Sequence, residues 1–123
     1  MIHAKIIGAG GYGGVGLTEL LLSHPEVKIS ALVDQQDVGS PLSALYPHLD
    51  GVCDLKIVAP DDPAAAKPAD VVFFSTPDRV GMTLARRELD SGAKVIDYSG
   101  DFRFNSAVTY ADYAQRLGLD TEH

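Results

Sequence analysis

The chain has 123 residues, of which 46% are hydrophobic, and it carries a formal net charge of −7. This length and composition predict one globular domain and exclude a disordered chain. The negative charge argues against nucleic acid and anionic membrane surfaces as main partners, and no apolar run is long enough to span a membrane. The N-terminal residues do not follow the pattern of a signal peptide. The single cysteine, Cys53, excludes an internal disulfide, so we expect a cytoplasmic protein.

Hydrophobic periodicity and turn residues predict strands that alternate with helices. Leu17, Leu20 and Leu21 lie at helical spacing, and His24-Pro25 ends that helix because the residue before a proline is pushed out of the α region. In chain order, we expect a strand at residues 3–7, a helix at 14–23, a strand at 27–33, a loop at 37–50 with a helical turn near 42–46, a strand at 54–58, a short helix within 60–68, a strand at 70–75, a helix at 80–91, a strand at 94–97 and a helix at 109–117.

Alternating strands and helices predict an α/β fold with a parallel sheet, in this case a Rossmann-like, doubly wound sheet. The strand expected at residues 70–75 is apolar on both faces, as is usual in a buried parallel sheet. Right-handed connections between neighbouring strands place residues 8–16 at the first strand-to-helix turn. We expect residues 1–123 to form a single domain.

Six of the chain's 12 glycines lie between Gly8 and Gly16. A glycine inside a helix or strand costs roughly 0.5–1 kcal/mol relative to alanine, so this segment needs backbone without side chains. Residues 8–13 fit the pattern G-x-G-x-x-G, in which the backbone approaches a diphosphate and the helix N-terminus offers free N–H groups. The pattern predicts binding of NADP or NAD. The alternative is a turn that only lets the helix pack on the strand.

Two further segments are candidates for cofactor contact. Asp34 follows the second strand, about 20 residues beyond the glycines, where a carboxylate accepts hydrogen bonds from a ribose 2′-hydroxyl and repels a 2′-phosphate. Residues 75–77 end a strand, where open α/β sheets bind ligands. The alternatives are a solvated aspartate and a simple turn. The residues that we expect to contact the cofactor are Gly8, Gly10, Gly11, Tyr12, Gly13, Gly14, Asp34, Gln35, Ser75, Thr76 and Pro77.

Neither the cysteine nor the histidines indicate a catalytic or metal site. Cys53 has no neighbouring base in the sequence to activate its thiol, which favours a structural role. The four histidines show no metal-ligand spacing, so we predict no metal site.

Several segments resemble the N-acetyl-gamma-glutamyl-phosphate reductases, which are related to the aspartate-semialdehyde dehydrogenases. The most specific is residues 94–104, which resemble the family's V-I-D-L-S-A-D-F-R. The glycine turn resembles G-A-S-G-Y-x-G, with Gly10 in place of the serine, followed by a leucine-rich helix closed by H-P. The other matching segments are Pro47-His48-Leu49 with Gly51, which resemble H-P-H-L-x-G, residues 70–77, which resemble a strand ending in L-P, and Glu122-His123, which resemble an E-H after a tyrosine-containing helix.

The resemblance implies the cofactor-binding domain of an arginine-biosynthesis enzyme that reduces an acyl phosphate to a semialdehyde with NADPH. In that family a cysteine thiolate attacks the acyl phosphate and hydride reduces the thioester. The family's catalytic cysteine and histidine lie beyond the E-H, so we expect no catalytic residue in this chain and no activity from it alone. The resemblance also implies that Ser99, Asp101 and Arg103 lie on the substrate side.

Arg103 could hold a carboxylate or phosphate in a bidentate contact, or it could pair with Asp97 or Asp101 and hold a loop. Two departures from the family concern the cofactor. Asp34 and Gln35 stand where the family often has serine and arginine, which favours NAD over NADP. Pro77-Asp78-Arg79 stands in the place of P-H-G. A stand-alone dinucleotide-binding or sensing module, a folded but empty domain, and a homo-oligomer remain open alternatives.

Overall fold

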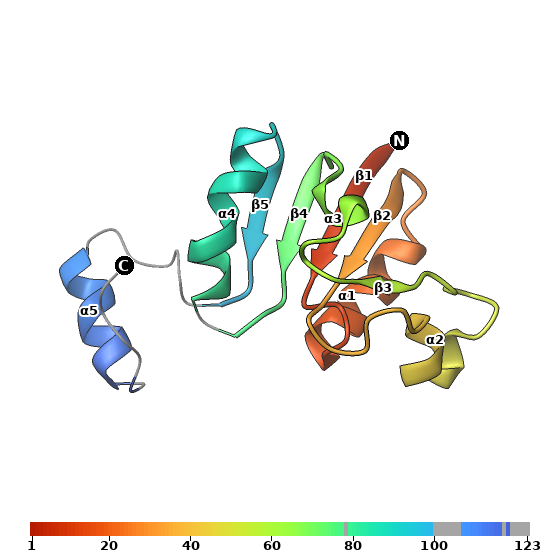
Figure 1. Cartoon of the computed structure of the whole chain (residues 1–123), viewed down its shortest axis with the longest axis horizontal. Helices are drawn as coiled ribbons and strands as arrows, with labels where there is room; N and C mark the ends of the chain where they lie inside the picture. Colours follow the sequence, from red (N-terminus) through yellow and green to blue (C-terminus); the bar gives the residue numbers. More distant parts are fainter. Residues whose placement is uncertain (78, 100–106, 117, 119–123) are drawn as a thin grey trace.

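The computed structural model describes residues 1–77, 79–99, 107–116 and 118. Within these residues, five parallel strands form one sheet in the order β3-β2-β1-β4-β5 (Figure 1). The strands are β1 (Ile2–Ile7), β2 (Val27–Val33), β3 (Ile57–Val58), β4 (Val71–Phe74) and β5 (Lys94–Asp97). The helices are α1 (Tyr12–Leu22), α2 (Leu42–Leu45), the 3-10 helix η1 (Pro47–Leu49), α3 (Pro63–Ala66), α4 (Val80–Asp90) and α5 (Ala107–Arg116). The predicted doubly wound α/β fold is confirmed.

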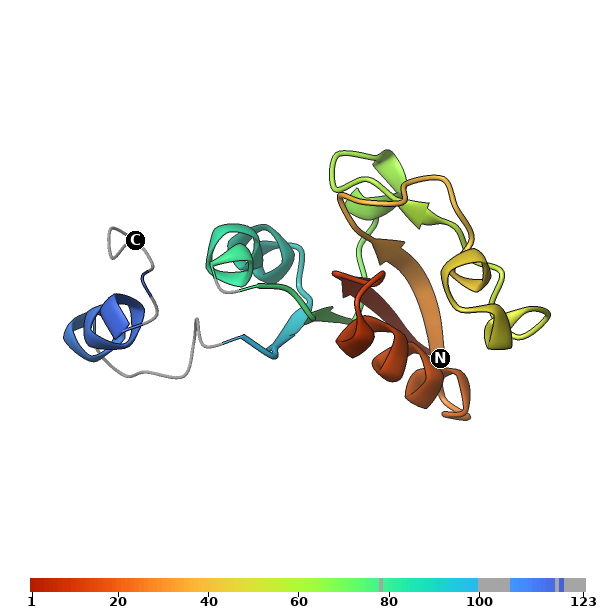
Figure 2. The same ribbon diagram turned by 90° about the horizontal axis from the view of Figure 1, so that it is seen from below.

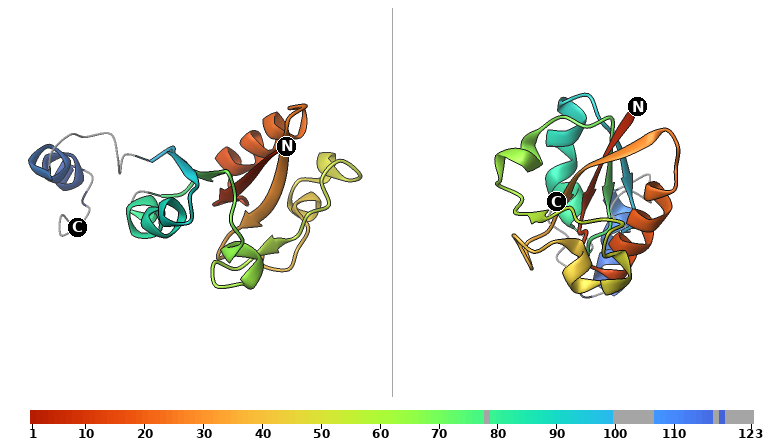
Figure 3. Two further views of the ribbon diagram at one scale, coloured as in Figure 1. Left: turned by 90° about the horizontal axis from the view of Figure 1, so that it is seen from above. Right: turned by 90° about the vertical axis from the view of Figure 1, so that its right-hand side faces the viewer.

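Helices cover both faces of the sheet (Figure 2, Figure 3). α1 and α2 enclose one core cluster, and α3 and α4 enclose a second cluster on the opposite face. Successive side chains of a strand point to opposite faces. Ile6 of β1 therefore belongs to the first cluster with Leu17, whereas Ile7 belongs to the second with Ala85.

α1 begins at Tyr12, two residues earlier than the predicted start at Gly14, so Gly13 and Gly14 lie in its first turn. The helix packs closely on the turn here, because a Cβ on Gly14 would lie 2.5 Å from the carbonyl oxygen of Gly8. The three leucines at helical spacing differ in burial. Leu17 is buried, but Leu20 is 71% exposed.

β3 is shorter than the strand expected at residues 54–58. It pairs with β2 only through Leu32–Ile57 and Val33–Val58. Leu55 instead accepts a hydrogen bond from the N–H of Leu42. The residues before β3 therefore bond to the segment that leads into α2.

β4 is apolar on both faces, as predicted, but only one face is fully buried. Val72 and Phe74 are buried against α4, whereas Val71 and Phe73 are half-buried. The same open side continues onto the edge strand β5, where Ile96 is exposed.

A buried ion pair joins β1 to the two helices of the second cluster. Lys5 is 1% exposed, and its Nζ donates to the carbonyl oxygen of Ala65 at 2.6 Å and to the carboxylate of Glu88 at 2.9 Å and 3.1 Å. Arg87 donates to the same carboxylate at 3.2 Å. β1, α3 and α4 are thereby held together at one point.

α5 lies beyond α4, at the end of the molecule away from β1 and β2 (Figure 1). α5 spans Ala107–Arg116, so it begins two residues before the predicted helix at residues 109–117 and ends one residue earlier. None of the helices that the structure describes is long and apolar enough to cross a membrane. The predictions made for Asp78, Asp101, Arg103, Glu122 and His123 lie outside the described residues.

Candidate functional site

A cleft of about 330 Å³ opens at the carboxyl ends of β1 and β4. These strands are neighbours in the sheet, but the chain leaves β1 toward α1 on one face and β4 toward α4 on the other. Open α/β sheets bind ligands at such a reversal. The lining comprises Ile7, Gly8, Gly10, Gly11, Asp34, Gln35, Gln36, Asp37, Pro60, Ser75, Thr76, Pro77, Val80 and Leu84.

At three of the glycines an added Cβ would collide with a neighbouring residue. Gly8 has φ +86°, and a Cβ there would collide with the carbonyl oxygen of Ser75. A Cβ on Gly13 would collide with Oγ of Ser75, and one on Gly14 would press on the carbonyl oxygens of Gly8 and Ala9. Packing therefore accounts for the glycine at positions 8 and 14, where the neighbours are backbone atoms, whereas at position 13 rotation of the Ser75 hydroxyl would relieve the contact.

Gly10 and Gly11 also line the cleft, but their surroundings differ. A Cβ on Gly11 would have ordinary contact only, at 3.9 Å, whereas a Cβ on Gly10 would lie 3.1 Å from Oδ2 of Asp34. The N–H groups of Tyr12, Gly13 and Gly14 follow at the start of α1, and they donate no hydrogen bond within the described part of the chain. No side chain caps this helix, and no acidic residue lies in its first turn. Free N–H groups at the positive end of a helix fit the diphosphate of a dinucleotide.

Asp34 is bound into the site and is not a merely solvated residue. Its Oδ2 accepts a hydrogen bond from the N–H of Gly10 at 3.0 Å, and its Oδ1 accepts from the N–H groups of Gln35 at 2.7 Å and Gln36 at 3.3 Å. A carboxylate has about four acceptor positions. Asp34 therefore keeps room for one further donor, such as a ribose hydroxyl.

The charge of the lining is negative. Asp34 and Asp37 contribute two carboxylates, and no lysine, arginine or histidine lines the cleft among the residues that the structure describes. Two nearby carboxylates make the site unfavourable for an additional phosphate at the ribose.

The end of β4 contributes the opposite wall. The N–H of Ser75 donates to the carbonyl oxygen of Ile7 at 2.9 Å, which holds this end of β4 against β1. The hydroxyl of Thr76 is buried and has no hydrogen-bond partner in the described residues. A buried hydroxyl without a partner is costly, so this oxygen suits a polar group of a ligand or a water.

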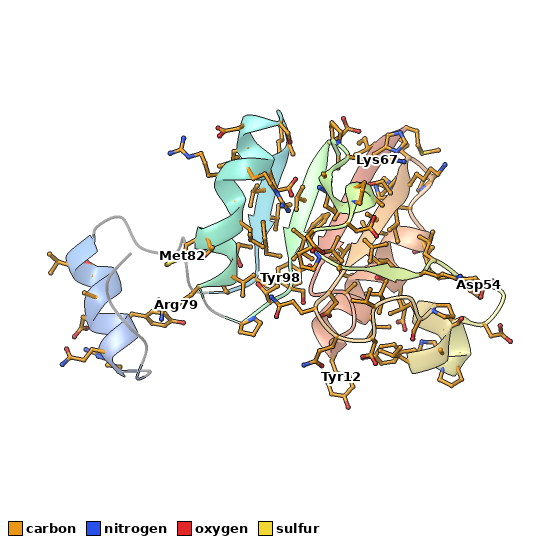
Figure 4. The ribbon with its side chains drawn as sticks, viewed as in Figure 1. Tyr12, Asp54, Lys67, Arg79, Met82 and Tyr98 are labelled. Atoms are coloured by element: carbon orange, nitrogen blue, oxygen red, sulfur yellow. The ribbon has the colours of Figure 1, made fainter. Side chains whose placement is uncertain are left out.

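Other predicted site residues lie away from the cleft. The side chain of Tyr12 is 88% exposed and points away from the molecule (Figure 4). Ser99 is buried, and its N–H donates to Oδ1 of Asp97 at 2.8 Å. Cys53 is buried in the first core cluster, where it packs as an apolar residue. The described residues contain no group of His, Cys, Asp and Glu side chains that could hold a metal ion.

Several residues of the site were not predicted from the sequence. Gln36 and Asp37 directly follow two residues that were predicted, and the positive φ of Asp37, +57°, marks the turn that keeps them at the cleft. Tyr46 was missed as well. Its hydroxyl donates to the carbonyl oxygen of Gly10 at 2.8 Å, across 36 residues of sequence, and no local pattern indicates such a contact.

The fold and this cleft define a nucleotide-binding domain of the Rossmann type. The chain belongs to the semialdehyde dehydrogenase, NAD binding domain family, which it matches over residues 3–112. It is 45% identical over 102 residues to an N-acetyl-gamma-glutamyl-phosphate reductase of Streptococcus sanguinis, and 42% identical over 113 residues to one of Acidithiobacillus ferrooxidans. These matches cover 83% and 92% of the chain, but only 30% and 33% of the two reductases.

Solved structures agree with this fold. An aspartate semialdehyde dehydrogenase from Candida albicans, solved with NADP, superposes with a TM-score of 0.70 at 18% identity, over 98% of this chain and 40% of that protein. GenD2 from gentamicin A biosynthesis, solved with NAD, gives a TM-score of 0.63 at 20% identity, over 96% of this chain and 32% of that protein. The resemblance to N-acetyl-gamma-glutamyl-phosphate reductases and the nicotinamide dinucleotide as the family's cofactor are confirmed.

Proposed function

We propose that residues 1–123 form the cofactor-binding domain of an N-acetyl-gamma-glutamyl-phosphate reductase and that this domain prefers NAD. The observation that carries the proposal is the cleft, with the bare backbone of Gly10 and Gly11, three free N–H groups at the start of α1, and the carboxylate of Asp34. The relatives of 42–45% identity support the reductase as the whole protein.

Each part of the dinucleotide has a fitting group in this chain. The N–H groups of Tyr12, Gly13 and Gly14 would hold the diphosphate, and Asp34 would accept a hydrogen bond from the adenosine ribose. When bound, the cofactor supplies a hydride. The reduction of an acyl phosphate to a semialdehyde further requires a nucleophilic cysteine, which the resemblance implies downstream of Glu122-His123.

The preference for NAD follows from charge. A 2′-phosphate would lie near Asp34 and Asp37, and the described residues of the lining offer it no cation. Each unit charge pair at about 4 Å contributes about 1 kcal/mol even in water. We therefore expect NAD to bind at least about tenfold more tightly than NADP.

Calorimetric titration of the 123-residue chain with NAD and NADP, each oxidised and reduced, tests cofactor binding. We expect one site and tighter binding of NAD. The double variant Asp34→Ser/Gln35→Arg introduces the residues that the family often has, so it should reverse the preference. Tighter binding of NADP by the wild type would refute the role given to Asp34, and no binding of either dinucleotide would refute the cofactor site.

The reductase activity needs a separate experiment. The chain would be joined to the remaining two thirds of the Streptococcus sanguinis relative, and reduction of the acyl phosphate would be measured by the absorbance of the reduced dinucleotide. A fusion that folds and binds NAD but reduces no acyl phosphate would argue against the reductase and leave cofactor binding intact.

A further inference from the structure

The peptide between Gly10 and Gly11 is flanked by glycine on both sides. Glycine populates positive and negative φ about equally, so neither neighbour restricts the orientation of this peptide through a side chain. In a trans peptide the carbonyl and the N–H point in opposite directions. If this peptide turned over, the carbonyl oxygen of Gly10 and the N–H of Gly11 would exchange sides, at a position that lines the cleft.

Two side chains hold the backbone on the two sides of Gly10. Asp34 accepts a hydrogen bond from the N–H of Gly10 at 3.0 Å, which fixes the peptide between Ala9 and Gly10. The hydroxyl of Tyr46 donates to the carbonyl oxygen of Gly10 at 2.8 Å, which fixes the peptide between Gly10 and Gly11. The N–H of Gly11 has only a long contact, 3.4 Å, with the carbonyl oxygen of Gly8. Tyr46 therefore provides the stronger of the two anchors on that peptide.

Tyr46 is itself held in place by packing. Its ring lies against the first core cluster and makes an edge contact with the ring of His48, with centroids 6.4 Å apart. Leu45, the preceding residue, lies 3.7 Å from the Cβ position of Gly10, so the end of α2 rests on the glycine turn. Burial raises the pKa of Tyr46, and Tyr12 and Asp37 raise it further, so the hydroxyl keeps its proton and remains a donor at neutral pH.

We propose that Tyr46 is a positioning residue for the dinucleotide. Its hydroxyl holds the Gly10–Gly11 peptide so that the carbonyl oxygen of Gly10 points to Tyr46 and the N–H of Gly11 points away from Tyr46. A carbonyl oxygen carries partial negative charge, and a peptide free to turn over would present that oxygen to the diphosphate in part of the molecules. Affinity falls in proportion to the fraction of molecules in the competent orientation. The ligand side of this inference rests on the proposed function.

The first arm of the test needs no ligand. Amide relaxation dispersion of Gly11 would be measured by NMR in the free wild type and in Tyr46→Phe, which keeps the ring and removes the hydroxyl. We expect no relaxation dispersion at the Gly11 amide in the wild type and microsecond-to-millisecond exchange in the variant. Equal dispersion in the two proteins would overturn the proposal.

The second arm compares ligands that contain the diphosphate with one that lacks it. We expect Tyr46→Phe to weaken the binding of NAD and of ADP-ribose by the same factor, about fivefold, which corresponds to one hydrogen bond. The weaker binding of adenosine should stay unchanged. The ratio of the affinities for NAD and NADP should also stay unchanged. Ser43→Ala is the matched control, because this hydroxyl lies on α2, the helix that Tyr46 directly follows, and donates to Asp54 at 3.2 Å on the exposed side. It should leave all dissociation constants unchanged.

Each outcome separates the possible roles of Tyr46. Wild-type affinity for ADP-ribose in Tyr46→Phe would overturn the proposal, and so would an equal loss for adenosine. If the variant were partly unfolded, the calorimetric stoichiometry would fall, whereas a positioning role changes the dissociation constant at full stoichiometry. If the wild type bound no dinucleotide, the proposed function would fail and the ligand part of this inference with it, even where the Gly11 amide responds to the substitution.

Discussion

The carboxylate of Asp34 and the N–H of Gly10 are joined by a hydrogen bond of 3.0 Å, which links the end of β2 to the glycine turn after β1. Asp34 thus shapes the turn and also lines the cleft. Asp34→Asn would replace one acceptor oxygen by an NH2 group, which cannot accept from either Gly10 or Gln35. We expect a loss of about 1–2 kcal/mol in the free energy of unfolding and at least tenfold weaker binding of NAD.

Chemical denaturation and calorimetric titration would measure these two effects. Asp54→Asn is a suitable control, because Asp54 is exposed and only accepts from Ser43, which an amide oxygen can also do. An Asp34→Asn variant as stable as the control, with unchanged affinity for NAD, would contradict the linking role of Asp34.

Gly8 and Gly16 should respond oppositely to replacement by alanine. Gly8 has φ +86° and no space for a Cβ next to Ser75, so Gly8→Ala should lower the free energy of unfolding by at least about 2 kcal/mol. Gly16 lies inside α1, with nothing within 4 Å of its Cβ position. Gly16→Ala should stabilise the protein by about 0.5–1 kcal/mol. Urea unfolding of both variants checks this, and a Gly8→Ala variant more stable than the wild type would contradict the positive φ and the close contact with Ser75.

Because Lys5 and Glu88 form an ion pair, we expect substitutions at these two positions to have non-additive effects on the free energy of unfolding. Lys5→Met alone leaves the buried carboxylate of Glu88 without its main partner, and we expect a loss of about 3–5 kcal/mol. Lys5→Met combined with Glu88→Leu removes both charges and should recover most of that loss. The double-mutant cycle would be measured by denaturant unfolding. Additive effects would mean that the two side chains do not interact.

The raised pKa of Tyr46 predicts a loss of stability at alkaline pH. Its pKa is raised in the folded state by burial, by Tyr12 and by Asp37. The folded state therefore favours the protonated hydroxyl, and the corresponding stability is present below the unfolded pKa of about 10 and is lost as the pH rises through the higher folded pKa. The free energy of unfolding of the wild type should decrease more between about pH 9 and pH 11 than that of Tyr46→Phe. Parallel curves for the two proteins would contradict this assignment.

Local patterns predicted much of the fold. The strand at residues 27–33 and the strand at residues 94–97 have the bounds expected from their apolar residues and turns. The alternation of strands and helices predicted the doubly wound sheet, because parallel neighbours need crossover helices. The turn at Gly8 and the carboxylate of Asp34 both adjoin the cleft for the same reason, since carboxyl ends of parallel strands meet at one edge.

Contacts between distant segments were not predictable from these patterns. Leu20 fits the helical spacing of Leu17 and Leu21, but only packing against β1 and β2 determines which of the three is covered. Tyr46 reaches Gly10 because α2 folds back over the turn, and the short loop helix that places it has no strong periodicity. The roles of Gly13 and Gly14 depended in the same way on the positions of Ser75 and Gly8.

The glycines of the turn differ in the space around them, and this difference has a consequence for evolution. Gly8 and Gly14 would be retained by any descendant that keeps this strand-to-helix turn, whether or not it binds a nucleotide, because their space is taken by the backbone of Ser75 and by the turn's own backbone. Gly11 is free of that constraint, whereas Gly10 is limited by the carboxylate of Asp34. A relative that has abandoned its cofactor should therefore still carry a glycine-rich signature, and a side chain at the position of Gly11 would be the first record of the loss.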